Sequence, residues 1–158
     1  MIVWIEKPLL LALHDRQIAE HGGSAGVRDD NLLQSALARP QQLFSYGDPA
    51  PDLADLAASL AFGIAKNHPF VDGNKRSAHV TYRTFLALND AELDATLEDK
   101  YITILALAES KLTEKEFAAW LRSHIHVTTR GQVQKPRAQY QRTSPPRKPA
   151  TRSKKTKA

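Results

Sequence analysis

The 158-residue sequence contains no cysteine, which excludes a disulfide framework and thiol catalysis. It also lacks any apolar run that approaches the roughly 20 residues a membrane-spanning helix needs. Its N-terminus has no basic segment followed by an apolar stretch, so we expect no signal peptide. A chain of this length is expected to form one domain around a single core. Together these features predict a small protein that acts in the cytoplasm, where it is made, without contacting a membrane.

Acidic residues are absent from residues 128–158, which contain 10 Lys/Arg, whereas residues 1–127 contain 12 Lys/Arg and all 17 Asp/Glu. The overall charge of +5 therefore combines a net −5 (12 − 17) with a net +10 (10 − 0). The basic segment also has four of the nine prolines and almost no large aliphatic side chain. Because it buries too little apolar surface to offset its chain entropy, we predict a folded domain over 1–127 and a disordered basic tail over 128–158.

Two interpretations of this tail remain open. Clustered Lys/Arg without acids is typical of nucleic-acid binding, but Tyr140 is its one aromatic residue, so any such binding is expected to be nonspecific. The alternative is a solubilising extension without a dedicated function. The tail also has the charge to contact an acidic body, either its own or that of a partner.

Apolar periodicity and helix-end signals predict a mostly α fold, a bundle of about six helices with at most short extended segments. Asp29 is expected to cap the second helix and Pro40 to end it, before a loop that runs to Pro51. Thr113 and Glu116 form a capping box for the last helix. The first five predicted helices cover about residues 8–20, 30–38, 52–67, 74–88 and 98–109, and extended segments are expected at 1–7 and 91–96.

The richest chemistry lies in the segment from Lys66 to Arg76, between two predicted helices. Pro69 disfavours the α region for His68 and so marks a helix end just before it. Gly73 permits unusual backbone dihedrals and close approach of a ligand. The free N–H groups and the dipole at the start of the next helix favour an anion. This arrangement predicts chemistry on a nucleotide phosphate.

The side chains of this segment have roles that suit such chemistry, and each also has a plainer alternative. His68 is a proton-transfer group, or a histidine that caps a helix end. Asp72 is an oxygen ligand of the kind that Mg²⁺ takes alongside substrate phosphates, or a cap for the following helix. Arg76 forks onto phosphate oxygens and Lys75 adds a compact charge, or both are solvated surface cations. Phe70 is expected to point into the core.

The segment resembles the signature of the Fic/Doc (Fido) superfamily, histidine-x-phenylalanine-x-acid-glycine-asparagine-x-arginine. The matching residues are His68, Phe70, Asp72, Gly73, Asn74 and Arg76. Adenylyl-transferring Fic proteins have a second glycine at position 75 and usually an arginine at position 79, where this chain has Lys75 and His79. Lysine there resembles the death-on-curing (Doc) toxin branch. The likeness covers about residues 1–126 and includes Leu13-His14-Asp15, Gly26-Val27-Arg28-Asp29 and Ala61–Asn67.

The resemblance implies an ATP-dependent kinase, the toxin of a toxin–antitoxin pair, that phosphorylates a Ser/Thr of a translation elongation factor. It implies His68 as general base, Asp72 as Mg²⁺ ligand, and a phosphate-binding set of Lys66, Gly73, Asn74, Lys75 and Arg76. The alternatives are AMP transfer to a protein hydroxyl, a noncatalytic binding module that keeps the loop, and nonspecific nucleic-acid binding through the tail.

Control by a separate partner is also expected. Many Fic proteins carry an inhibitory helix with the pattern Ser/Thr-x-x-x-Glu-Gly/Asn. Here only Ser110 has a glutamate four positions later, Glu114, and Lys115 follows it. The resemblance therefore implies a cognate antitoxin, whose C-terminal segment forms a helix on the toxin.

The remaining histidines and aromatic residues are expected to be structural. His14 is expected to form a buried, hydrogen-bonded pair with Asp15. His124 and His126 are two residues apart, so a helix would not present them together as metal ligands. The aromatic residues assigned to the core are Phe62, Phe85, Phe117 and Trp120.

Overall fold

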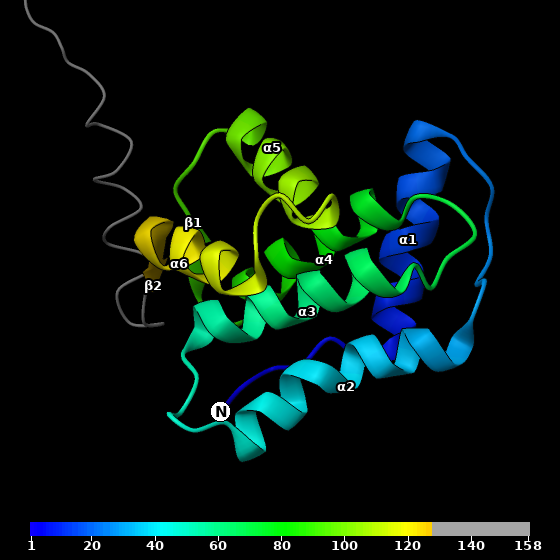
Figure 1. Cartoon of the computed structure of the whole chain (residues 1–158). Helices are drawn as coiled ribbons and strands as arrows, with labels where there is room; N and C mark the ends of the chain where they lie inside the picture. Colours follow the sequence, from blue (N-terminus) through cyan, green and yellow to red (C-terminus); the bar gives the residue numbers. More distant parts are fainter. Residues whose placement is uncertain (128–158) are drawn as a thin grey trace, which may run out of the picture. The chain divides into compact units, whose positions relative to one another are not determined.

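The computed structural model describes residues 1–127, which form six α-helices and two short strands (Figure 1). The predicted mostly α fold is confirmed. In chain order the elements are α1 (Lys7–His21), α2 (Asp30–Tyr46), α3 (Leu53–Asn67), α4 (Asn74–Leu88), β1 (Ala91–Leu93), α5 (Leu97–Ala108), α6 (Glu114–His124) and β2 (Ile125–Val127).

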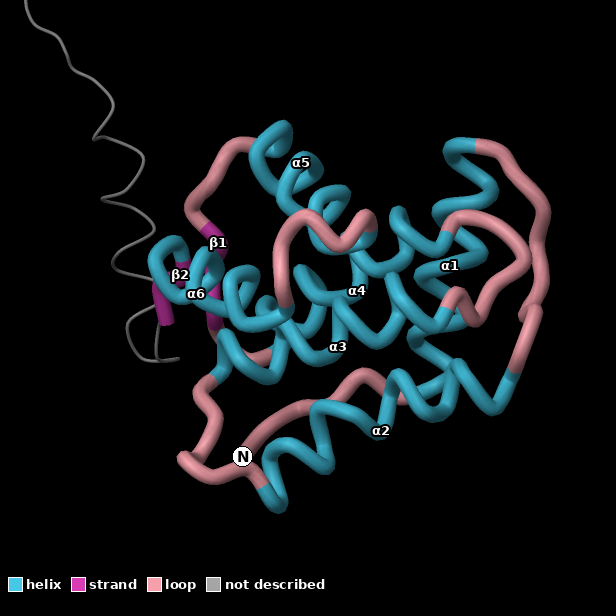
Figure 2. Tube along the Cα trace, viewed as in Figure 1, coloured by secondary structure: helices cyan, strands magenta, loops and turns pink. Residues whose placement is uncertain are grey.

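Helix α3 is the centre of the domain, because α2, α4, α5 and α6 all pack against it, while α1 packs on α4 (Figures 1 and 2). Its sequence is rich in alanine and nearly every residue from Ala54 to Ala65 is buried. Gly63 allows the closest approach, since a Cβ there would lie 3.1 Å from Cα of Ala36 in α2. Small residues in α3 thus bring the surrounding helices close to its axis.

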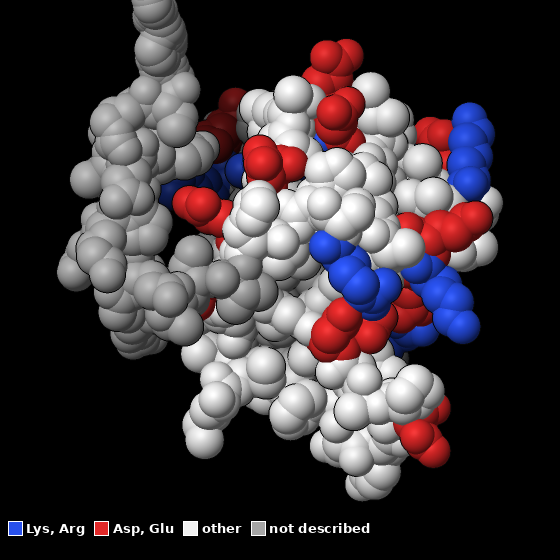
Figure 3. Space-filling model, turned by 90° about the vertical axis from the view of Figure 1, so that its left-hand side faces the viewer, with Lys and Arg blue, Asp and Glu red and all other residues white. Residues whose placement is uncertain are grey.

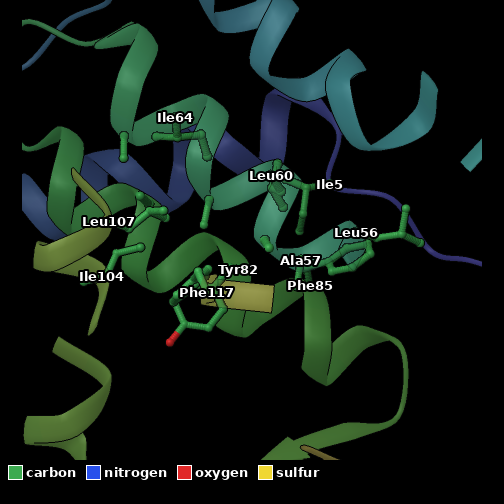
Figure 4. Packing of buried hydrophobic residues seen from close by; sticks show 14 of the residues in the cluster. Ile5, Leu56, Ala57, Leu60, Ile64, Tyr82, Phe85, Ile104, Leu107 and Phe117 are labelled. Carbon is green, nitrogen blue, oxygen red and sulfur yellow. The ribbon is translucent and has the colours of Figure 1, made fainter. Parts of the chain in front are cut away.

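The core is one cluster of buried apolar side chains from every helix (Figure 4). Phe70, Tyr82, Phe85 and Phe117 are its largest members, and each is 1% exposed or less. Phe62 and Trp120 are only partly buried and lie against this cluster. Burying a large apolar side chain contributes roughly 1.5–3 kcal/mol each, so this cluster fixes the helices that carry the site.

Several predicted helix ends are confirmed. Asp29 accepts a hydrogen bond from the N–H of Leu32 at 3.0 Å and caps α2. Thr113 and Glu116 form the reciprocal capping box that begins α6. A second capping box, formed by Asp52 and Asp55 at the start of α3, was not predicted.

The predicted end of the second helix at Pro40 is wrong, because α2 continues through Pro40 to Tyr46. A proline inside a helix loses one backbone hydrogen bond. Here the residues that follow offset that cost by packing. Leu43 lies against the core, and the ring of Phe44 lies edge-on to that of Trp4, with ring centroids 5.6 Å apart. The loop predicted from Pro40 to Pro51 is correspondingly shorter.

The extended segments are also shorter than predicted. Residues 1–6 form no strand, although Asn89 binds both backbone groups of Val3. The segment predicted at 91–96 contains only β1, which pairs with β2, a strand that was not predicted. The disordered tail predicted at 128–158 lies outside the described residues, and the predicted domain boundary at residue 127 stays a prediction.

Within residues 1–127, no helix is long and apolar enough to cross a membrane. On the face shown in Figure 3, both acidic and basic side chains are present, and broad uncharged areas separate them. Charge of one sign therefore does not dominate the described part of that face.

Candidate nucleotide-phosphate site

The site forms where the end of α3 meets the start of α4. Helix α3 ends at Asn67, and His68 follows with φ 50° and ψ 57°. The residue before a proline is thus outside the right-handed α region, as predicted, but in the left-handed region instead of the extended one. Gly73, with φ 77°, precedes α4, whose first turn has no side-chain cap. The free N–H groups of α4 therefore open onto the loop that carries His68.

Arg28, from the loop between α1 and α2, holds the end of α3. Its Nε donates to the carbonyl of His68 at 2.7 Å and its Nη2 to that of Asn67 at 2.9 Å. An antiparallel bridge between Val27 and Phe70 joins the same two loops, which lie side by side in Figure 2. Sequence reasoning missed this role of Arg28; the only signal was the family-like segment Gly26–Asp29.

The loop rests on a buried histidine. The ring of His14 stacks on Phe70 with centroids 3.7 Å apart, and its Nδ1 lies 2.8 Å from Oγ of Ser77. The predicted pair with Asp15 is wrong, because Asp15 is exposed and Ser77, one turn into α4, reaches the ring instead. Burial lowers the pKa of His14, although Asp15 and Asp72 act in the opposite direction. Phe70 is buried as expected.

The side chain of Asn74 is fully engaged within the loop, and Asn74 is only 5% exposed. Its Oδ1 accepts from the N–H of Phe70 at 2.9 Å, and its Nδ2 donates to the Phe70 carbonyl at 3.0 Å. Nδ2 also lies 3.2 Å from Nδ1 of His68. Asn74 therefore shapes the loop and holds His68, and its side chain has no group left for a ligand.

Asp72 is fixed by backbone groups on both sides. Its Oδ1 accepts from the N–H of Gly73 at 2.8 Å, and its Oδ2 accepts from that of Ser24 at 3.2 Å. A Cβ at Gly23 would lie only 2.7 Å from Oδ2, so a glycine is needed there. The alternative role of Asp72 as the cap of α4 is not seen, because that helix has no side-chain cap.

This donor set fits Mg²⁺ delivered with a nucleotide. Within residues 1–127 there is no group of three or more His, Cys, Asp or Glu that could hold a metal on its own. Mg²⁺ is commonly bound through one or two carboxylates together with substrate phosphates and water. Asp72 is exposed and oriented by two N–H groups, so it can supply that single carboxylate.

Residues of the signature loop and of the first turn of α4 line a pocket of about 270 Å³. Lys75 is exposed and makes no hydrogen bond or ion pair within the described part of the chain, while Nη1 of Arg76 reaches the carbonyl of Gly22 at 3.4 Å. Tyr101, from α5, was not predicted and lines the pocket from another helix. The full lining is His68, Val71, Asp72, Gly73, Asn74, Lys75, Arg76 and Tyr101.

Other predicted residues lie elsewhere. Lys66 does not line the pocket, because its ammonium binds Ser110 and the carbonyl of Ala108 at the end of α5. His124 lies against Trp120, with ring centroids 4.6 Å apart, and His126 lies 3.4 Å from Asp94. The structure therefore brings together six of the seven predicted site residues, all from one loop and one helix start.

Comparison with known proteins identifies the family. The Fic/DOC family model matches residues 4–86. Over 77 residues the chain is 46% identical to "Toxin Doc" of Mycolicibacterium smegmatis (strain ATCC 700084 / mc(2)155), covering 49% of this chain and 59% of that protein. Over 84 residues it is 32% identical to "Protein kinase doc" of Escherichia phage P1, covering 53% of this chain and 66% of that protein. The matches thus span about two thirds of these relatives or slightly less. The chain belongs to the Doc branch of the Fic/DOC family.

Proposed function

We propose that the chain is the toxin of a toxin–antitoxin pair and transfers the γ-phosphate of ATP to a Ser/Thr hydroxyl of a target protein. The observation that carries this proposal is one pocket that combines His68 with the uncapped start of α4. A proton acceptor and an anion-binding helix end are two groups that assist phosphoryl transfer to a hydroxyl.

The reaction follows from these positions. His68 takes the proton of the acceptor hydroxyl as the hydroxyl oxygen forms a bond to the γ-phosphorus. The bond from that phosphorus to the β,γ-bridging oxygen breaks, and ADP leaves with the electron pair. Lys75, Arg76 and the N–H groups of α4 stabilise the phosphate charge throughout. Mg²⁺ held by Asp72 would neutralise further charge on the phosphate oxygens.

Lys75 favours phosphate transfer over the alternative, AMP transfer. A glycine at this position would leave room for a phosphate against the backbone, whereas lysine fills that room and adds a charge. Lys75 lines the pocket without a partner in residues 1–127, so its ammonium is available to the nucleotide. The name of the phage relative, "Protein kinase doc", supports the same choice.

The target and the partner are carried over from the family resemblance. The target is a translation elongation factor, whose modification would inhibit translation. The partner is an antitoxin whose C-terminal segment folds into a helix on the toxin. The name "Toxin Doc" of the mycobacterial relative supports a toxin that needs such a partner.

The test uses ATP labelled at either the α- or the γ-phosphorus, with a purified elongation factor as acceptor. We expect label to transfer only from the γ position, with release of ADP, and His68→Ala to abolish transfer without unfolding the protein. Losing a general base typically costs about 10²–10⁴ in rate. Transfer from the α position would establish AMP transfer instead, and no transfer from either would favour a noncatalytic binding module.

A further inference from the structure

Among residues 1–127, Tyr101 is the only Phe, Tyr or Trp that lines the pocket, and it comes from α5, outside the signature loop. The other lining residues come from the loop and the start of α4, and they offer N–H groups, charges and one imidazole. Their chemistry suits the triphosphate and the acceptor hydroxyl. Apart from the His68 imidazole, these residues offer no ring on which the planar base of the nucleotide could stack.

Tyr101 has the exposure and support that a base-stacking residue needs. Its side chain is 45% exposed, so one part of the ring is open, while another part leans on His79 of α4 with ring centroids 6.1 Å apart. His79 in turn packs on Tyr82, which is fully buried. The ring is therefore held at the rim of the pocket by two successive tilted ring contacts, the second of which reaches the buried Tyr82.

His79 supports the ring without adding charge. Burial lowers the pKa of His79 to about 4, and the nearby Arg83 and Lys100 act in the same direction. At neutral pH His79 is thus an uncharged aromatic surface behind Tyr101. A tyrosine held in this way has little side-chain entropy to lose when a base stacks on it.

We infer that Tyr101 binds the purine base of the nucleotide by stacking, and so makes the site selective for a nucleoside triphosphate over inorganic triphosphate. This inference rests on the proposed function, because it takes the phosphates to bind at the start of α4.

The experiment compares the binding of ATP with that of inorganic triphosphate, both with Mg²⁺, by titration calorimetry on the full chain. Tyr101→Ala should weaken ATP binding by about tenfold and leave triphosphate binding unchanged, because stacking on an aromatic side chain is worth about 1–3 kcal/mol per base. Tyr101→Phe keeps the ring and should retain ATP affinity. Ile102→Ala is the matched control, since Ile102 is 53% exposed on the same helix and does not line the pocket.

Equal ATP binding by wild type and Tyr101→Ala would overturn the inference. Equal weakening of ATP and triphosphate would also overturn it, because Tyr101 would then act on the phosphate loop instead of the base. If the wild type binds ATP no better than triphosphate, the inference is overturned, because the pocket then binds the phosphates but not the base. Wild type that binds neither would overturn the proposed function as well.

Discussion

Nδ2 of Asn74 lies 3.2 Å from Nδ1 of His68, and this contact decides which nitrogen of the histidine carries the ring proton. The amide orientation is fixed, because its oxygen accepts from Phe70 N–H and its nitrogen donates to the Phe70 carbonyl. Nδ2 can only donate, so Nδ1 accepts and a neutral ring carries its proton on Nε2. A base that acts through Nε2 needs the other tautomer. For Nε2 to accept a proton, the ring proton must first move to Nδ1, and the contact with Asn74 must then break.

The first prediction is that Asn74→Asp reverses this tautomer. A carboxylate still accepts from Phe70 N–H and also accepts from Nδ1–H of His68, which moves the ring proton to Nδ1. Nitrogen chemical shifts of the imidazole measure the position of this proton without an activity assay. Losing the donor to the Phe70 carbonyl should cost roughly 1–3 kcal/mol of unfolding free energy.

Asn67→Asp is the control for this prediction. It adds the same charge one residue before His68, but the Asn67 amide donates to the carbonyl of Leu32 and does not contact the ring. In Asn67→Asp, the ring proton of His68 should therefore stay on the same nitrogen as in the wild type. Nitrogen shifts showing a proton on Nδ1 in the wild-type protein would contradict the assignment of the Asn74 contact.

The second prediction concerns Gly23 and the carboxylate that it faces. Gly23→Ala places a Cβ 2.7 Å from Oδ2 of Asp72 and should displace that carboxylate. The Mg²⁺ concentration that supports half-maximal ATP binding should then rise several-fold, as for the loss of a metal-orienting contact.

Gly22→Ala separates this steric effect from backbone strain. Gly22 also has a positive φ, 85°, but a Cβ there would have nothing within 4 Å. Because its ψ is 174°, this backbone conformation is essentially restricted to glycine, so the variant should lower stability by about 1–3 kcal/mol and leave the Mg²⁺ dependence unchanged. An equal shift in both variants would show that the strain of the loop, and not contact with Asp72, controls the metal.

Much of this site could be predicted because its determinants are local in sequence. Pro69 ends α3 and Gly73 begins α4, so the position of His68 between two helices follows from nearest neighbours. The contacts that were missed are long-range. Arg28 and Tyr101 reach the site from other elements, and no local pattern marks either of them.

Two errors have the same physical origin. The turn chemistry of Pro40 favours a helix end, but packing of Leu43 and Phe44 extends α2 beyond it. The proximity of Lys66 to His68 in sequence suggested a shared site, but Lys66 lies one residue inside the end of α3 and reaches α5. Tertiary contacts decided both cases.

The third prediction is that Lys75→Gly weakens phosphate transfer and allows some AMP transfer. The change removes a charge that has no partner within residues 1–127 and frees space beside the start of α4. Because glycine also costs about 1 kcal/mol inside a helix, Lys75→Ala is the control that removes the charge but keeps a Cβ. Transfer of γ-label should fall at least tenfold in both variants, and α-label should appear only in Lys75→Gly. Unchanged γ-transfer in Lys75→Ala would argue against a role for the ammonium.

The last prediction is a pH dependence of stability that comes from His79. Burial, with Arg83 and Lys100, lowers the pKa of His79 from 6.5 to about 4 in the folded protein. Between these values the unfolded chain binds more protons than the folded one, so the unfolding free energy falls as pH falls below 6.5 and levels off below about 4. The loss should be about 1–2 kcal/mol, after allowance for solvent screening at the partly exposed edge of the ring.

Urea unfolding of wild type and His79→Leu at several pH values from 7 down to 4 measures this effect. The variant should lose that part of the pH dependence, because leucine cannot take up a proton in either state. His21→Leu is the control, since His21 is exposed at the end of α1 and should leave the slope unchanged. The buried His14 titrates in the same direction, so some pH dependence remains in His79→Leu. Identical slopes in wild type and His79→Leu would mean that His79 is as free to protonate in the folded protein as in the unfolded chain, and the uncharged support behind Tyr101 would be lost with it.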